Sequence, residues 1–320
     1  MFKNLLLFSI FLLSQMNGTI YSNNKYVASK KITSKDYHLN SETKKKTLKI
    51  LSWNIFMLPY ISRFNATADR AVQISNEMKK SDYDILVFQE AFSAHGRKIL
   101  SVRLKKEYPY QYGPANKCII PFKTNSGLWI LSKLPLTRLD DIKFQQSEGF
   151  DGIAQKGAVL FTGEFNGSAF QVLATHLQAD GKPGIREKQC YQIKNQLLQK
   201  HYLANVPQII CGDFNIEMSD HEHYNNMIQT LDAKNGNING ELQYTYDEIN
   251  NTLVKNQGEK RKLIDYILVR NENFIQKIER RIQTFYLQIG EKFTHLSDHY
   301  ALEAEIHFDV SETAMINQNN

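Results

Sequence analysis

The stretch Gln208-Ile209-Ile210-Cys211-Gly212-Asp213-Phe214-Asn215 decides the fold of this 320-residue chain. Its apolar run predicts a strand that is buried on both faces. The run stops at Gly212, and a carboxylate and a carboxamide follow at Asp213 and Asn215. Side chains two residues apart at a strand end can point the same way, into a cleft that holds a metal ion or a phosphate. The same residue types also favour an ordinary turn, so other segments must decide between the two interpretations.

The composition is that of a globular protein with a modest positive charge. Hydrophobic residues make up 42% of the chain and charged residues 22%, and the sequence contains no repeat and no long low-complexity run. The length allows one large domain or two of ordinary size. The net charge of +6 suits a phosphate-bearing partner, and both nucleic acid and a membrane surface meet that description.

The N-terminal residues 1–22 predict a secretory signal peptide, and hence a secreted protein. A lysine precedes the apolar run Leu5–Leu13, and polar and then small residues follow it. This run is far shorter than the roughly 20 residues that span a bilayer, and a buried N-terminal helix is the competing interpretation. Residues 23–47 predict a polar, lysine-rich leader, residues 48–308 one domain, and residues 309–320 a frayed tail.

The three cysteines are too few and too scattered for a disulfide framework or a zinc site. Cys211 lies in the apolar run and is expected in the core. Cys118 and Cys190 could form one bridge in an oxidising compartment, and the sequence leaves that open.

Apolar periodicity predicts alternating strands and helices along the domain. Helices are expected over residues 69–80, 93–106, 185–203 and 220–231. Strands are expected over residues 48–53, 84–88, 127–132, 157–165, 169–174, 263–269 and 300–308. Residues 235–251 are expected to form a loop. Hairpin-like regions, such as the one around Asn166-Gly167, argue against a purely parallel sheet, so the prediction is a two-sheet sandwich covered by helices.

Polar residues recur at or beside the ends of the apolar strands. They are Asn54, Glu90, His176, Asp213, Asn215, Asp265, Asp298 and His299. Each alone has a structural explanation such as a cap or an ion pair, but strand ends are also where α/β folds build clefts. Glu90 and Asn54 offer the oxygen ligands that suit Mg²⁺, whereas zinc-type spacings of cysteine or histidine are missing.

Ser297-Asp298-His299 supplies a candidate general base. An imidazole with its ordinary pKa of about 6.5 can take a proton from water near neutral pH. A carboxylate on the other ring nitrogen would fix the tautomer and stabilise the imidazolium. Adjacent side chains on a strand diverge, so Asp265 competes with Asp298 for this role.

These residues, in this order, resemble the endonuclease/exonuclease/phosphatase superfamily of magnesium-dependent phosphodiesterases. The match covers residues 48–308 and rests on Ser-Trp-Asn54, Gln-Glu90, Gly-Asp213-Phe-Asn215 and Ser-Asp298-His299 taken together. The resemblance implies a DNase-I-like fold of class α/β (α+β): a four-layer α/β/β/α sandwich with two mixed β-sheets flanked by helices.

Within the superfamily the chain looks most like the secreted bacterial-type neutral sphingomyelinases, or sphingomyelinases C. The similar segments include Gln89-Glu90-Ala91-Phe92, Thr175–Asp180 and Asp151-Gly-Ile-Ala-Gln-Lys156-Gly157. The resemblance implies Mg²⁺-dependent hydrolysis of sphingomyelin, or a related phospholipid at a membrane surface, to ceramide and phosphocholine. It also implies that Mn²⁺ or Co²⁺ can substitute, and that the enzyme acts as a monomer without an obligate protein partner or nucleic acid.

Carried over by position, the resemblance assigns a metal site and a base. Glu90 binds the central Mg²⁺, and Asn54 lies nearby as a ligand or phosphate contact. His299 activates water for in-line attack on phosphorus, and Asp298 or Asp265 orients its imidazole.

The resemblance also assigns the contacts to the phosphate. His176, Asn215 and Lys156 stabilise charge on the phosphoryl oxygens, and Asp213 orients the water or a neighbouring side chain. For Lys156 the competing interpretation is an exposed lysine beside a turn.

The sequence departs from the sphingomyelinase pattern in two places. The region that holds an aromatic membrane-inserting hairpin in the bacterial toxins is short here, over residues 283–293, and lacks tryptophan. The family's disulfide is missing, because the positions around Ser147 and Gly181 hold no cysteine. Two other functions remain alternatives: a secreted Mg²⁺-dependent nuclease of the same superfamily and a non-catalytic membrane-binding module.

Overall fold

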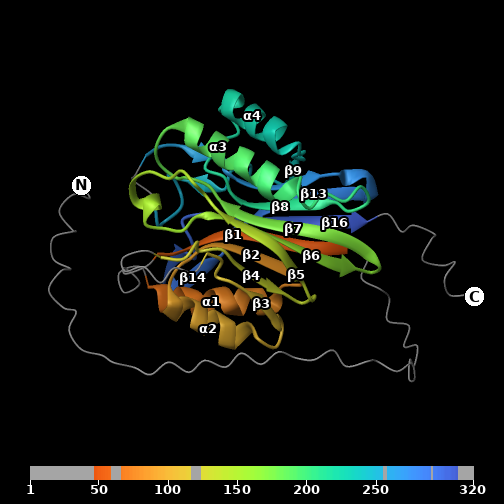
Figure 1. The fold of residues 1–320 in the computed structure, drawn as a ribbon. Coiled ribbons are helices and arrows are strands. Elements are labelled where there is room, and N and C mark those ends of the chain that lie inside the picture. Colours follow the sequence, from red (N-terminus) through yellow and green to blue (C-terminus); the bar gives the residue numbers. More distant parts are fainter. Residues whose placement is uncertain (1–46, 59–65, 117–123, 255–257, 290, 309–320) are drawn as a thin grey trace, which may run out of the picture. The chain divides into compact units, whose positions relative to one another are not determined.

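The computed structural model describes residues 47–58, 66–116, 124–254, 258–289 and 291–308. These residues all belong to one compact unit. Four layers follow one another in Figure 1: helices α1 and α2, a first sheet, a second sheet, and helices α3 and α4. The helices are α1 (Thr67–Lys80), α2 (Ala94–Leu104), α3 (Pro183–Ile193), which continues as one π-helical turn over Lys194–Leu198, and α4 (His221–Leu231).

Both sheets are mixed. In spatial order the first contains β3 (Tyr110–Tyr112), β4 (Trp129–Ser132), β2 (Ile85–Ala91), β1 (Thr47–Met57), β16 (Ala301–Phe308), β13 (Ile275–Gln283) and β9 (Ile238–Asn239). The second contains β12 (Asp265–Arg270), β8 (Gln208–Asp213), β7 (Ser168–His176), β6 (Gly157–Phe165) and β5 (Thr137–Lys143). The pairs β1–β2 and β7–β8 are parallel, and their neighbours β16 and β12 run antiparallel to them.

Two short ribbons lie outside the main sheets. One pairs β10 (Tyr246–Asp247) with β11 (Arg261–Lys262), and the other pairs β14 (Tyr286–Ile289) with β15 (Lys292–His295). The second ribbon is the short hairpin that precedes Ser297. Within the described ranges, no helix combines the length and the apolar character needed to cross a membrane.

The alternating apolar pattern of β1 explains the layering. Leu48 and Ile50 face the core between the two sheets, whereas Leu51 and Trp53 face the core beneath α1 and α2. Successive side chains of a strand point to opposite faces, so a strand that is apolar at both sets of positions must be covered on both sides.

The structure confirms the predicted two-sheet sandwich, with differences in detail. The helix expected over residues 185–203 begins at Pro183 and leaves the α-helical pattern after Ile193. Strands β13 and β5 were not expected, because both carry charged residues on an exposed face. Cys190 and Cys211 are buried and free, and Cys118 lies outside the described residues.

Candidate active site

The register of the second sheet brings three of the predicted site residues side by side. Asp213 at the end of β8 pairs with His176 at the end of β7 and with Asp265 at the start of β12. Because β12 is antiparallel to β8, its first residue lies at the same edge as the last residue of β8. All three side chains are almost fully buried.

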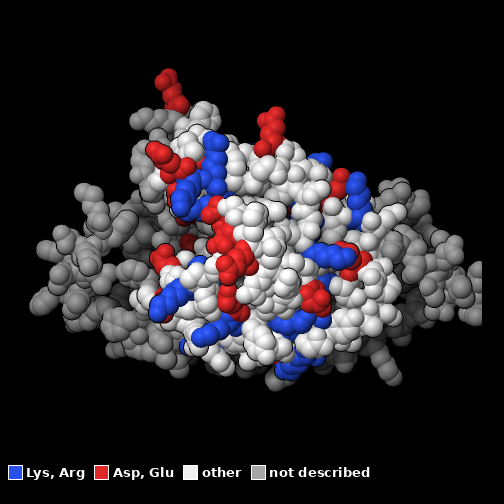
Figure 2. Space-filling view, turned by 90° about the horizontal axis from the view of Figure 1, so that it is seen from above, with Lys and Arg blue, Asp and Glu red and all other residues white. Residues whose placement is uncertain are grey.

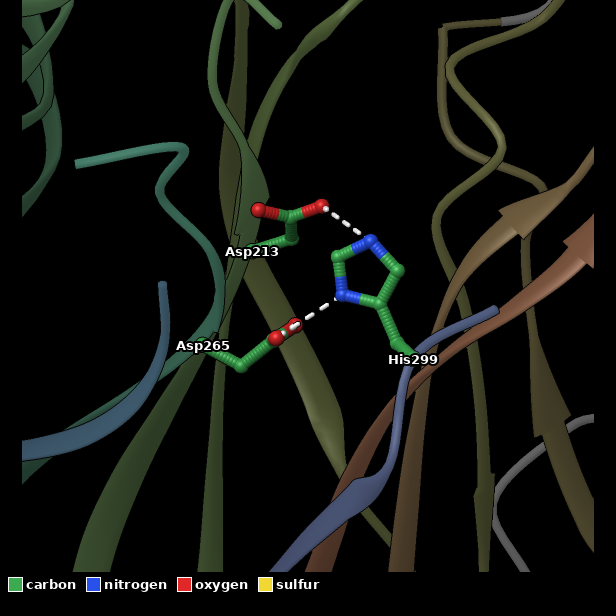
Figure 3. A group of neighbouring side chains, drawn as sticks. All are labelled: Asp213, Asp265 and His299. Carbon is green, nitrogen blue, oxygen red and sulfur yellow. Dashed lines mark hydrogen bonds and ion pairs between the residues drawn. The ribbon is translucent and has the colours of Figure 1, made fainter. Parts of the chain in front are cut away.

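His299 approaches this edge from the other sheet, from the segment just before β16. Its Nδ1 donates a hydrogen bond to Oδ2 of Asp265 over 2.8 Å, and its Nε2 lies 3.7 Å from Oδ2 of Asp213. Figure 3 shows the imidazole between the two carboxylates. The backbone is fixed as well, since the indole nitrogen of Trp53 donates to the carbonyl of His299 over 2.9 Å.

Of the two candidates for orienting the imidazole, Asp265 is therefore the one that accepts a hydrogen bond from Nδ1 of His299. The other candidate, Asp298, has its Oδ1 3.2 Å from the hydroxyl oxygen of Ser297. Burial raises the pKa of the Asp298 carboxyl, and the charges of His299 and Arg70 oppose that rise. Asp298 lies beside His299 in the chain and contributes negative charge to its surroundings.

The pKa of His299 is set by two opposing effects. Burial lowers it, whereas the carboxylates of Asp265, Asp213 and Asp298 raise it, and together they hold the pKa well above its ordinary value of 6.5. The imidazolium that forms when His299 accepts a proton is thus strongly stabilised.

Asp213 contacts residues of both sheets at this edge. Its Oδ2 accepts a hydrogen bond from Nδ2 of Asn54 over 3.1 Å and lies 3.4 Å from Nε2 of His176. Its Oδ1 accepts from the backbone N–H of Asn215 over 3.0 Å. Burial and the neighbouring Asp265 raise the pKa of Asp213 to about 6, although the charge of His299 opposes this.

Glu90 occupies a constrained turn at the end of β2. Its φ is +53°, in the left-handed region that non-glycine residues seldom adopt. Gly127 packs against it so closely that a Cβ there would lie 3.1 Å from the Glu90 Cα, and Gly127 itself has a φ of +72°. Burial and the charge of Asp298 raise the pKa of Glu90 to about 7.

Three buried polar atoms of the site have no hydrogen-bond partner among the described residues. They are Oε2 of Glu90, Nδ1 of His176 and Oδ1 of Asp265. Buried polar atoms are nearly always satisfied, so a cluster of unsatisfied ones marks a place that an ion, water or substrate completes.

At this site, two groups of side chains could hold a metal ion. Ligand atoms of Asp213, Asp265 and His299 lie within 4.8 Å of one another. In this group, however, the ring nitrogen of His299 already donates to Asp265. Glu90 instead offers a carboxylate oxygen with no hydrogen-bond partner among the described residues, and Asn54 lies on the neighbouring strand, paired with Gln89. The Glu90 side is therefore the better fit for a hard cation.

Lys156 is buried and supports His176 from behind. Its ammonium donates to Nε2 of His176 and to the carbonyl of Leu177, both over 3.0 Å, and forms an ion pair with Asp151 over 2.8 Å. Burial, together with the charges of Lys156 and His299, holds the pKa of His176 well below 6.5. A neutral His176 that accepts at Nε2 carries its proton on Nδ1.

A cavity of about 490 Å³ opens above these groups. Its lining includes Glu90, His176, Asp213, Asn215, Asp298 and His299. Asp265 and Asn54 do not line the cavity themselves. Asp265 is hydrogen-bonded to the lining residue His299, and Asn54 to the lining residue Asp213. Lys156 borders a separate hollow, so it too acts on the cavity through His176.

The structure adds a cavity residue that the sequence did not reveal. Tyr246 lines the cavity and lies edge-on to the His299 ring, with the ring centres 5.2 Å apart, and its backbone bridges to His299. The residue lies in a stretch expected to be loop. Only the pair of tyrosines at Tyr244 and Tyr246 could have drawn attention to it.

The geometry can support hydrolysis of a phosphate ester. It combines a buried imidazole with a carboxylate on its far nitrogen, an acidic oxygen suited to a cation, and neutral donors from His176 and Asn215 around one cavity. These parts match the requirements of water activation and of charge stabilisation at phosphorus.

A family model described as the endonuclease/exonuclease/phosphatase family matches residues 51–299. The chain belongs to this family. Its relatives include sphingomyelinases C, and the four-layer architecture is that of the bacterial sphingomyelinase structures. Homology to these relatives supports a phosphodiesterase enzyme.

Three comparisons give the extent of the similarity. Sphingomyelinase C 2 from Leptospira interrogans is 29% identical over 299 residues, which cover 84% of this chain and 48% of the relative. A sphingomyelinase C from Bacillus cereus is 26% identical over 302 residues, covering 83% of this chain and 90% of the relative. A mutant beta toxin from Staphylococcus aureus with bound magnesium ions is 23% identical with a TM-score of 0.70, covering 81% of this chain and 99% of that one. The chain spans about half the length of the Leptospira relatives.

Proposed function

We propose that this chain is a secreted, Mg²⁺-dependent phosphodiesterase that hydrolyses sphingomyelin to ceramide and phosphocholine. The observation that carries the proposal is the hydrogen bond of 2.8 Å between Nδ1 of His299 and Asp265, which leaves Nε2 facing the cavity beside Asp213. The sphingomyelinase relatives supply the substrate class.

His299 acts as the general base. Its Nε2 takes a proton from a water molecule, the water oxygen attacks phosphorus, and the bond between phosphorus and the ceramide oxygen breaks. The ceramide alkoxide then takes a proton from solvent, the His299 imidazolium returns its proton to solvent, and phosphocholine keeps the oxygen of the attacking water. Asp265 holds the ring in the tautomer that leaves Nε2 free and stabilises the imidazolium after proton transfer.

The phosphoryl oxygens meet neutral and positive groups. His176 presents its Nδ1–H, which has no partner among the described residues, and Asn215 lines the same cavity. Lys156 keeps His176 in this tautomer and adds positive charge behind it. Asp213 orients the attacking water together with His299.

Glu90, with Asn54 on the adjacent strand, is the group that would hold Mg²⁺. The unpartnered Oε2 of Glu90 and the oxygen-only donor set fit a hard cation. Once bound there, Mg²⁺ would neutralise charge on a phosphoryl oxygen and on the departing alkoxide.

The distribution of charge favours a lipid over nucleic acid. Residues 1–46 contain eight lysines and two acidic residues, so this segment alone accounts for the net charge of +6. Figure 2 shows lysines and arginines interspersed with acidic residues on the face that carries α3 and α4. A binding surface for polyanionic nucleic acid would instead concentrate one sign of charge.

The proposal includes the organisation of the chain. Residues 1–22 direct export, residues 23–47 form a leader, residues 48–308 are the catalytic domain, and residues 309–320 form a tail. The enzyme acts as a monomer at the lipid surface without an obligate protein partner.

A substrate panel tests the proposal. Purified protein is incubated with sphingomyelin vesicles, phosphatidylcholine vesicles or DNA, each with Mg²⁺ or with EDTA. Release of phosphocholine from sphingomyelin only with Mg²⁺ is the expected result. Cleavage of DNA without lipid hydrolysis would establish the nuclease instead, and no turnover of any substrate would favour the binding module.

A further inference from the structure

Arg70, in the first turn of α1, is a charged side chain that the proposed chemistry does not use. It is 1% exposed, yet all of the hydrogen bonds observed for its guanidinium go to backbone carbonyls. A buried arginine is costly unless its donors are satisfied, and five N–H groups in a rigid plane can hold several acceptors at once.

The first set of carbonyls belongs to the irregular end of β1. Nη1 and Nη2 donate to the carbonyl of Phe56 over 2.9 and 2.8 Å, and Nη2 also donates to Ile55. The pairing of β1 with β2 shifts between Asn54 and Met57, and Phe56 adopts a left-handed φ of +48°. Arg70 thus satisfies the carbonyls that this departure from the ladder leaves unpaired.

This turn orients Asn54. The backbone N–H of Phe56 donates to Oδ1 of Asn54 over 3.1 Å, which directs Nδ2 of the same side chain toward Asp213. The guanidinium also lies over the ring of Phe56, with its carbon 5.5 Å from the ring centre. A shift of Phe56 would therefore turn the Asn54 carboxamide.

The third carbonyl belongs to the segment that carries the base. Nε of Arg70 donates to Leu296 over 2.8 Å, and Leu296 directly precedes Ser297-Asp298-His299. Ser297 makes a second tie between the same two segments, because its hydroxyl donates to the carbonyl of Asn54 over 2.5 Å. Arg70 is thus a clamp between the end of β1 and the His299 segment.

We propose that Arg70 is a positioning residue that holds Asn54 and His299 in register across the cavity. This inference rests on the proposed function for its kinetic readout. The structural readout is independent of the proposed function, because binding of Mg²⁺ alone can be measured without any substrate.

The test compares two arginines that tie α1 to its surroundings. Arg70→Met removes every hydrogen bond of the clamp at similar side-chain length, whereas Arg70→Lys keeps the charge but cannot span three carbonyls. Arg103→Met is the matched control. Arg103 joins α2 to Ser75 and Asn76 of α1, on the helix side of the first sheet. Its loss should lower stability without reaching the site.

For Arg70→Met we expect kcat to fall about 10–100-fold with KM little changed, as is usual when a residue that orients a catalytic group is removed. Arg70→Lys should recover only part of kcat, and Arg103→Met should keep the wild-type kcat despite a lower Tm. A folded Arg70→Met with wild-type kcat would overturn the inference. So would an equal loss of kcat in Arg103→Met. If Arg70→Met does not fold, wild-type kcat in Arg70→Lys overturns the inference and reduced kcat supports it.

Calorimetric titration with Mg²⁺ alone separates this inference from the proposed function. If the wild-type protein binds Mg²⁺ but hydrolyses no lipid, the proposed substrate fails and the clamp is still tested. Weaker Mg²⁺ binding in Arg70→Met and Arg70→Lys supports a positioning role through Asn54. Tighter binding in Arg70→Met would show that the guanidinium acts only as a repelling charge, and would overturn the inference.

Discussion

Replacing Asp265 with asparagine tests the assignment of the base most sharply among single substitutions. The introduced carboxamide is nearly isosteric with the carboxylate and can still accept a hydrogen bond, but it cannot stabilise the imidazolium of His299. The lost interaction is a buried, charge-assisted hydrogen bond of 2.8 Å. Such bonds contribute about 1.5–3 kcal/mol, and each 1.36 kcal/mol of barrier changes a rate about tenfold, so kcat should fall about 10–100-fold.

Asp298→Asn is the matched comparison, because Asp298 neighbours His299 in the chain but its carboxylate lies against the hydroxyl of Ser297. Both variants are assayed for phosphocholine release at saturating sphingomyelin and saturating Mg²⁺, with folding checked by circular dichroism. The loss of kcat should be clearly larger for Asp265→Asn. A larger loss for Asp298→Asn, with Asp265→Asn near wild type, would refute the assignment of Asp265 as the partner of the base.

Three further predictions concern pH and metal. A general base must be neutral, and the neighbouring carboxylates hold the pKa of His299 well above 6.5, so kcat/KM should be lost as pH falls through a value above 6.5. Asp265→Asn should move this acidic limb of the pH profile to lower pH, and an unmoved limb would contradict the assignment. The pKa of Glu90 is raised to about 7. Ionisation of this buried carboxyl should therefore lower the free energy of unfolding of the metal-free protein as pH rises from about 5 to 7. Glu90→Gln should therefore raise the Tm of the metal-free protein at pH 8, by about 2–4 °C for each kcal/mol of unfolding free energy recovered. The same substitution should remove the increase in Tm that Mg²⁺ causes, and an increase that persists would place the metal elsewhere. Burial and the charge of Lys156 lower the pKa of His176, so Lys156→Met should raise that pKa in an NMR titration, whereas an unchanged titration would contradict the contact.

The buried strands were predictable because a run of apolar residues on both faces of a strand is stable only when both faces are covered. Residues 48–53 and 84–88 are apolar at both sets of alternating positions, and both strands lie between two layers. By contrast, β13 has the sequence Ile275-Gln-Lys-Ile-Glu-Arg-Arg-Ile-Gln283, in which solvent-facing charges hide the alternation. The pairing partner β16, not local propensity, makes it a strand.

The site was predictable as a position at strand ends, but its contacts were not. Asp213, His176 and Asp265 could be placed at one edge, yet the choice of Asp265 over Asp298 depends on a register between β8 and β12 that no local pattern encodes. Arg70 did leave a signal, because it is in phase with Ile74 and Met78 on the apolar face of its helix. A charged residue at such a position indicates a buried side chain with dedicated partners.

The source of the oxygen in the product tests the central claim most directly. Wild-type protein and His299→Ala are each incubated with sphingomyelin vesicles and Mg²⁺ in water enriched in oxygen-18. The masses of the products are measured by mass spectrometry, and folding is checked by circular dichroism. The account predicts that wild-type phosphocholine carries one heavy oxygen, that ceramide carries none, and that folded His299→Ala releases neither product. Heavy oxygen in ceramide, or wild-type turnover by His299→Ala, would contradict the attack of a His299-activated water on phosphorus.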